Sequence, residues 1–87
     1  MLQEELQILN EEGLHARPAG VLAKTAAGFQ SQILLEFNGK KVNAKSVLSL
    51  MSLGLKKDSA FKISVDGQDE ALAMNSLKTL ICNRFSV

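Results

Sequence analysis

The only histidine of the chain lies three residues before its only proline. Both belong to the run GLHARPAG, which occupies residues 13–20. Proline fixes its own φ and has no N–H group, so it is favoured in the first turn of a helix, where that donor would lack a partner. We therefore expect a helix to begin near Ala16, with His15 at its N-terminus. The free amide N–H groups and the positive dipole end of such a helix disfavour an imidazolium and favour a bound anion.

Arg17 lies in the same predicted turn and carries a permanent planar cation, which suits the oxygens of a phosphoryl or carboxylate group. A neutral imidazole beside it is a nucleophile. A single histidine is most often a surface or helix-capping residue. The tetrapeptide His-Ala-Arg-Pro, however, occurs by chance only about once in 100,000 positions. The combination predicts a site for a transferable phosphoryl group.

Other chemistry of His15 is less consistent with the sequence. A metal site needs more ligands than one histidine and one cysteine, and Cys82 lies far along the chain. A Ser-His-Asp hydrolase is also disfavoured, because the chain has no Gly-x-Ser-x-Gly motif and 87 residues leave little room for a triad and an oxyanion hole. We therefore expect no metal and no cofactor, and we expect Cys82 to be an inert thiol.

The length and composition narrow the class of protein. A chain of 87 residues, 46% of them apolar, predicts a single domain over residues 1–87. No apolar run approaches the roughly 20 residues of a membrane span, and the start of the chain is unlike a signal peptide, so we expect a cytoplasmic protein without membrane insertion. A net charge of +1 and the absence of Trp and Tyr argue against direct binding of nucleic acid.

The elements before and after His15 follow from periodicity. Alternation predicts a strand over residues 2–9 and then a loop over residues 10–13, which places His15 just beyond the edge of a sheet. The helix that follows should end at Gly28, with an apolar stripe facing inward. The inward residues are Pro18, Leu22, Ala26 and Phe29, and the outward ones are Arg17, Gly20, Lys24 and Ala27.

The middle of the chain predicts a hairpin and a short helix. Two strand-like runs flank Asn38-Gly39, a dipeptide typical of a type I′ turn. Ser46 is well placed as the N-cap of a helix over residues 47–53 that ends at Gly54. This predicted helix has more apolar residues than one of its faces can bury against the sheet. We expect Leu50 and Leu53 to face inward, and Val47, Leu48 and Met51 to form an exposed apolar patch.

The remaining residues predict a fourth strand over residues 61–66 and a last helix with Asp69 as its N-cap. The core stripe of that helix is Ala73, Met74, Leu77, Ile81 and Phe85. The order β-α-β-β-α-β-α predicts an α+β domain in two layers. One face of its four-stranded, mainly antiparallel sheet should be open and the other covered by helices.

Two motifs in this chain resemble a known family. The run around His15 resembles the active-site signature of HPr, the histidine phosphocarrier of the bacterial sugar phosphotransferase system, and the chain has that family's length. The run NAKSVL, residues 43–48, resembles a second HPr signature, found in carriers of low-GC Gram-positive bacteria. The resemblance implies an open-faced β-sandwich with three helices on one face of the sheet. It also implies that His15 becomes phosphorylated, with Arg17 assisting.

The resemblance further implies partners. The carrier would accept its phosphoryl group from enzyme I, which phosphoenolpyruvate charges, and would donate it to enzyme II A domains in sugar uptake. Ser46 would be phosphorylated by an HPr kinase/phosphorylase, although physical reasoning alone favours a simple helix cap. We expect partners to contact an outward surface that comprises Ala16, Gly20, Lys24, Val47, Leu48 and Met51.

Two other functions stay open from the sequence. The first is a regulatory HPr paralogue that acts mainly as a phospho-Ser46 corepressor with a catabolite-control transcription factor, or in a nitrogen-related branch. Some regulatory relatives replace the active-site histidine, so the presence of His15 argues against that paralogue. The second is an α+β domain without such a role.

Overall fold

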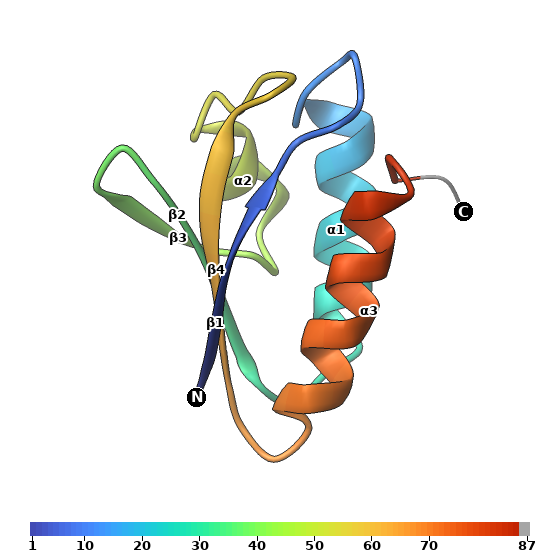
Figure 1. Cartoon of the computed structure of the whole chain (residues 1–87). Helices are drawn as coiled ribbons and strands as arrows, with labels where there is room; N and C mark the ends of the chain where they lie inside the picture. The colour runs from blue at the N-terminus through green and yellow to red at the C-terminus, as the bar shows by residue number, and fades with distance from the viewer. Residues whose placement is uncertain (86–87) are drawn as a thin grey trace.

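The computed structural model describes residues 1–85, which form a four-stranded sheet with helices on one face (Figure 1). Residues 86–87 of the predicted domain lie outside the described part of the chain. The predicted α+β class and element order are confirmed. The strands are β1 (Leu2–Gln7), β2 (Gln32–Phe37), β3 (Lys40–Asn43) and β4 (Ala60–Asp66), and the helices are α1 (Ala16–Ala27), α2 (Val47–Met51) and α3 (Glu70–Cys82).

The strands lie in the order β1-β4-β2-β3, and each neighbouring pair is antiparallel. The register places apolar side chains opposite one another on the face that the helices cover. Leu35 of β2, for example, lies opposite Ile63 of β4 on one side and Val42 of β3 on the other, and all three are buried. Pairs of this kind stabilise a sheet. The core therefore lies between this face and the buried residues of the helices.

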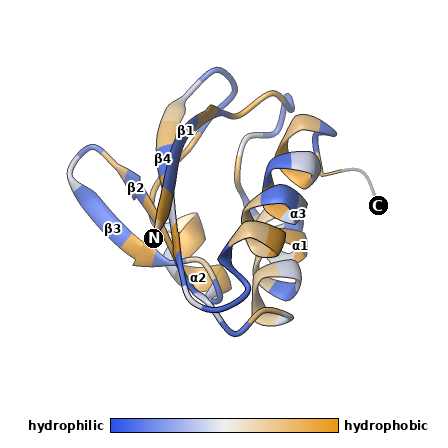
Figure 2. Ribbon diagram, turned by 60° about the horizontal axis from the view of Figure 1, so that its bottom comes forward, coloured by the Kyte–Doolittle hydropathy of each residue, from blue (hydrophilic) through white to orange (hydrophobic). Residues whose placement is uncertain are grey.

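The hydropathy of the elements agrees with this layering. β3 is mainly blue in Figure 2, because it carries Lys40 and Lys41, whereas α2 is mainly orange. All members of the predicted core stripe of α3 are buried, and Leu80 joins them, but Phe85 lies beyond α3, which ends at Cys82. In the described part of the chain, no helix has the length and apolar character to cross a membrane.

Asn38 and Gly39 have φ values of 55° and 80°, as the predicted type I′ turn requires. Two other elements, β1 and α2, are shorter than predicted. β1 ends before Ile8, because the backbone of Ile8 bonds to Asp58 and Ser59 instead of continuing the regular ladder. α2 ends at Met51, and its chain then tightens into a turn at Gly54, whose φ is 68°.

Asp69 lies at the N-cap position of α3, but the prediction that its side chain caps the helix is wrong. Its carboxylate accepts hydrogen bonds from the backbone N–H groups of Gln30 and Ser31, at 2.8 and 2.9 Å, and from the Ser31 hydroxyl. Ser31 is buried. Asp69 therefore joins the connection between α1 and β2 to the turn between β4 and α3, two segments that lie together at the bottom of Figure 1.

We expect Asp69→Asn to lower the thermal midpoint at neutral pH by about 4 °C or more, since charged acceptors make the stronger hydrogen bonds. The bonds from the Ser31 side chain and the Gln30 backbone lower the pKa of Asp69 from its usual value of 3.8. A lowered pKa in the folded state means that the carboxylate stabilises the protein above pH 3.8 and that this contribution is lost as pH falls through the folded pKa. Thermal unfolding from pH 7 to pH 2 should show the difference from wild type shrinking below pH 4. Asp58→Asn is the matched control, and an equal effect there would contradict the assignment.

Candidate functional site

His15 lies at the start of α1, as predicted. Its backbone is extended at the N-cap position, with φ −106° and ψ −160°, and its carbonyl accepts a hydrogen bond from Ala19 N–H at 2.9 Å. Its side chain is exposed and, within residues 1–85, makes no capping hydrogen bond to the helix. Pro18 is buried in the first turn. The imidazole is therefore free at the surface, at the helix end that favours anions.

The loop before His15 is held by the buried residue Asn10. The Asn10 side-chain amide donates to the Gly13 carbonyl at 2.7 Å and to the Glu12 carboxylate at 3.4 Å, and Gly13 N–H donates to the Asn10 carbonyl at 3.2 Å. Leu14 then donates its N–H to the Leu55 carbonyl at 2.9 Å. These bonds fix the backbone on the N-terminal side of His15 against the segment that follows α2.

Gly13 is required in this loop for two reasons. Its φ is +71°, and a Cβ atom built on it would lie 2.6 Å from the Leu55 carbonyl oxygen. We therefore expect Gly13→Ala to lower the free energy of unfolding by about 1–3 kcal/mol. Gly20→Ala is the control, since a Cβ there meets no atom within 4 Å. It should stabilise the helix by up to about 1 kcal/mol.

Urea unfolding of both variants measures these two effects. A Gly13→Ala protein as stable as wild type would show that the loop does not need its contact with Leu55.

Arg17 and Glu12 bring opposite charges to the surroundings of His15. Arg17 is exposed on the first turn of α1. The pKa of Glu12 is lowered, first by a hydrogen bond from its own backbone N–H, then by the Asn10 side chain, and further by the charges of His15 and Arg17. Sequence reasoning did not include Glu12 among the site residues. The available signal was a carboxylate three positions before the histidine.

Ser46 caps α2, as predicted, because its hydroxyl oxygen accepts a hydrogen bond from Ser49 N–H at 3.3 Å. The adjacent Lys45 reaches the turn that follows α1, where its ammonium donates to the Phe29 carbonyl at 2.8 Å. Leu50 and Leu53 are buried, as predicted. The outward residues of α2 are exposed to 37% for Val47, 81% for Leu48 and 39% for Met51. These three residues form what we call the α2 patch.

The predicted site residues all lie on α1 and α2 or at their N-caps, and these two helices pack against each other. Ala16, Arg17 and Lys24 are exposed, and Gly20 is half-buried. A hollow of about 560 Å³ lies at the C-terminal half of α1 and the turn that follows it. It is lined by Val21, Lys24, Thr25, Gly28 and Phe29. Across residues 1–85, no group of three His, Cys, Asp or Glu side chains is placed to hold a metal ion.

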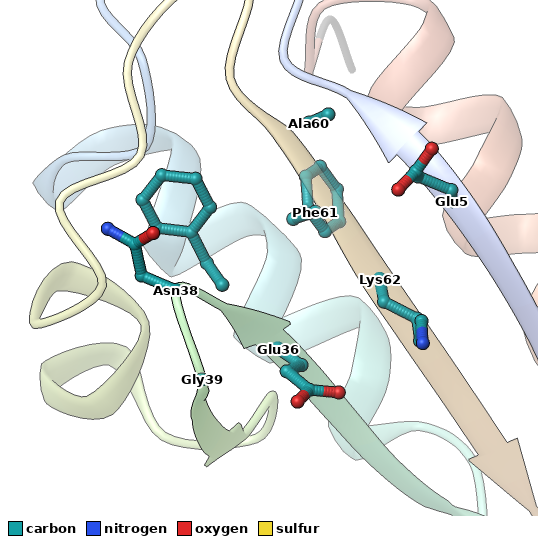
Figure 3. A pocket seen from close by; sticks show the side chains of 8 residues that line it. Glu5, Glu36, Asn38, Gly39, Ala60, Phe61 and Lys62 are labelled. Atoms are coloured by element: carbon teal, nitrogen blue, oxygen red, sulfur yellow. The ribbon is translucent and has the colours of Figure 1, made fainter.

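A second hollow, of about 220 Å³, lies on the sheet (Figure 3). Its charged residues come from neighbouring strands, with Lys62 opposite Glu5 on one side and Glu36 on the other. None of the predicted site residues lines it. Its alternating charges are typical of cross-strand pairs that stabilise an exposed sheet face.

The family model described as the phosphorylation site of the HPr component of the PTS, the phosphotransferase system, matches residues 2–83. The structure of HPr-C-His from Thermoanaerobacter tengcongensis is 45% identical, with a TM-score of 0.94, over 98% of this chain and 96% of that one. A phosphocarrier protein HPr from Bacillus anthracis is 35% identical, with a TM-score of 0.88, over 92% and 95%. The catabolite repression protein Crh of Bacillus subtilis is 34% identical, with a TM-score of 0.77, over all of both chains.

The helix-start histidine, the open antiparallel sheet and these matches along nearly the whole chain agree with one another. The chain therefore belongs to the HPr family of phosphocarrier proteins of the phosphotransferase system.

Proposed function

We propose that this chain accepts a phosphoryl group on His15 from phosphorylated enzyme I and donates it to enzyme II A domains in sugar uptake. The observation that carries this proposal is the exposed His15 ring at the N-terminus of α1, on a backbone that Asn10 and Leu55 hold in place. A fixed, exposed nucleophile can enter the active site of a donor protein and then that of an acceptor.

The transfer needs little from the carrier itself. A ring nitrogen of His15 forms a bond to phosphorus as the bond between phosphorus and the donor breaks, with that electron pair staying on the donor. The proton that leaves His15 balances the one that the donor's leaving atom gains. Phosphoryl transfer depends mainly on positioning and on stabilising charge on the equatorial oxygens. The free amides at the start of α1 and the Arg17 guanidinium supply such charge.

We expect both partners to dock on the outward surface of α1 and α2. On α1 this surface comprises Ala16, Gly20 and Lys24, and the α2 patch lies on the helix packed beside it. Exposed apolar side chains next to cations suit a partner surface that is apolar and acidic. This arrangement allows donor and acceptor to bind in turn.

Regulation is assigned to Ser46. Phosphorylation by an HPr kinase/phosphorylase would place a dianion at the start of α2, beside the α2 patch. A catabolite-control transcription factor would bind the chain in this Ser46-phosphorylated form. A mainly regulatory role is the alternative, and the likeness to Crh favours it. The presence of His15 favours the carrier. We place the protein in the cytoplasm, where enzyme I and the A domains act.

Incubation with enzyme I and labelled phosphoenolpyruvate tests the proposal. We expect one acid-labile label per chain, in the peptide that contains His15. A label elsewhere, or no label with enzyme I that charges another carrier from the same source, would contradict the proposal.

Arg17→Ala should slow phosphoryl acceptance by about tenfold or more without changing the thermal midpoint, because Arg17 is exposed and its charge acts on the phosphoryl oxygens. Arg17→Lys should recover only part of the rate, since an ammonium lacks the planar fork of the guanidinium. Lys41→Ala, which removes an exposed cation from β3, is the control. Rapid-quench measurement of transfer from enzyme I gives the rates, and an unchanged rate for Arg17→Ala would remove it from the site.

A further inference from the structure

We propose that Glu12 is a tuning residue for His15: its carboxylate destabilises the phosphorylated form of the ring and so favours donation over retention. This inference rests on the proposed function, because it concerns the phosphoryl group that His15 would carry. The effect is electrostatic, and Glu12 makes no bond to phosphorus.

The geometry of the loop places the Glu12 carboxylate. The Asn10 side-chain amide donates to Glu12 Oε1 at 3.4 Å and to the Gly13 carbonyl at 2.7 Å, so one buried group holds both the carboxylate and the backbone that leads to His15. The next residue, Leu14, donates its N–H to the Leu55 carbonyl at 2.9 Å, which holds the same stretch of backbone against the segment that follows α2. The exposed Glu12 carboxylate is therefore tied, through Asn10, to the loop that leads to the start of α1.

The charges of this region act on one another. His15 and Arg17 both contribute to lowering the pKa of Glu12, after the larger contributions of its backbone and of Asn10. Coulomb interactions are reciprocal, so the ionised Glu12 acts equally on any charge placed at His15. No acidic residue lies in the first turn of α1, and Glu12 is the nearest carboxylate before that turn in the sequence.

Phosphorylation reverses the sign of the interaction. A resting His15 site beside Arg17 attracts the Glu12 carboxylate, whereas a phosphoryl group on the ring brings two negative charges that repel it. This repulsion raises the free energy of the phosphorylated carrier relative to the free one.

Two measurements test this tuning. The first is the equilibrium distribution of the phosphoryl group between enzyme I and the carrier. We expect Glu12→Gln to shift it about two- to fivefold toward the phosphorylated carrier, as expected for an exposed charge pair, with the shift reduced in 1 M salt. Glu12→Asp, which keeps the charge, should retain most of the wild-type behaviour.

The second measurement does not need enzyme I. Phosphoramidate loads the histidine chemically, and hydrolysis of the isolated product is then followed. Water oxygen bonds to phosphorus as the P–N bond breaks. The electron pair returns to the ring nitrogen, one water proton stays on the phosphate, and the other goes to the ring. We expect the Glu12→Gln product to persist about two- to fivefold longer than wild type.

Glu11→Gln is the matched control, because Glu11 is the neighbouring carboxylate but pairs with Lys57 at 3.3 Å. It should behave like wild type in both measurements. An unchanged Glu12→Gln protein, an opposite shift, or an equal change in Glu11→Gln would each overturn the inference. A wild-type chain that phosphoramidate loads but enzyme I does not would reject the proposed function, and the hydrolysis comparison would still decide the role of Glu12.

Discussion

His15→Ala is expected to abolish phosphoryl acceptance, with the rate from enzyme I falling by more than about a thousandfold, as for other nucleophile deletions. His15 is the only histidine of the chain, and neither Arg17 nor Glu12 can replace an imidazole nucleophile. The loss should be complete even at high concentrations of enzyme I, because it removes the bonding atom and not the docking surface.

The fold should survive this change. The His15 side chain is exposed and does not cap α1 within the part of the chain that the structure describes, so its removal should alter the free energy of unfolding by less than about 0.5 kcal/mol. Urea unfolding measures that control, and His15→Asn serves as a second variant. Label retained in either variant would place the phosphoryl acceptor elsewhere.

Phosphorylation of Ser46 is expected to have the second-largest effect, and two opposing contributions decide it. At the start of α2 a phosphate should stabilise by about 0.3–1 kcal/mol, which is too little to remodel the fold. In a docking surface, the same charge can oppose an acidic partner by several kcal/mol. Ser46→Asp should therefore fold as well as wild type, since aspartate also caps helices, yet accept phosphate from enzyme I about tenfold more slowly or worse.

Two kinds of control show whether the Ser46→Asp defect comes from negative charge in general or from its position beside the α2 patch. Asn75→Asp adds the same charge to an exposed position of α3 and should transfer at the wild-type rate. Val47→Glu and Met51→Glu change the α2 patch and should reproduce the Ser46→Asp defect. High salt should reduce all three defects. Equal rates for wild type and the Ser46-phosphorylated protein at low salt would leave Ser46 as a helix cap only.

Much of the scaffold was predictable because its signals are local. Pro18 marks the start of α1, Asn38-Gly39 fixes the hairpin, and Ser46 caps α2. Each of these depends on backbone conformations that a single residue type favours. The burial of Leu50 and the exposure of Leu48 followed from the small size of the chain, which cannot bury every side of a short helix.

The parts that could not be predicted depend on contacts between distant segments. The Asp69 carboxylate bonds to Gln30 and Ser31, nearly forty residues away, and the local N-cap pattern gave no sign of that choice. In the same way, the Ile8 backbone bonds to both Ser59 and Asp58 and so leaves the regular ladder, which ends β1 early. The role of Asn10 in holding Glu12 and Gly13 depends on its burial, which a polar residue in a predicted loop does not indicate.

Phosphoryl carriage is tested most directly by following one phosphoryl group through the protein. The chain is loaded by enzyme I with labelled phosphoenolpyruvate, separated from enzyme I, and mixed with an enzyme II A domain in a single turnover. We expect the label to leave His15 and to appear on the A domain at the same rate, with little released as inorganic phosphate. Label that stays on the carrier, or that appears only as inorganic phosphate, would contradict its role as a phosphocarrier.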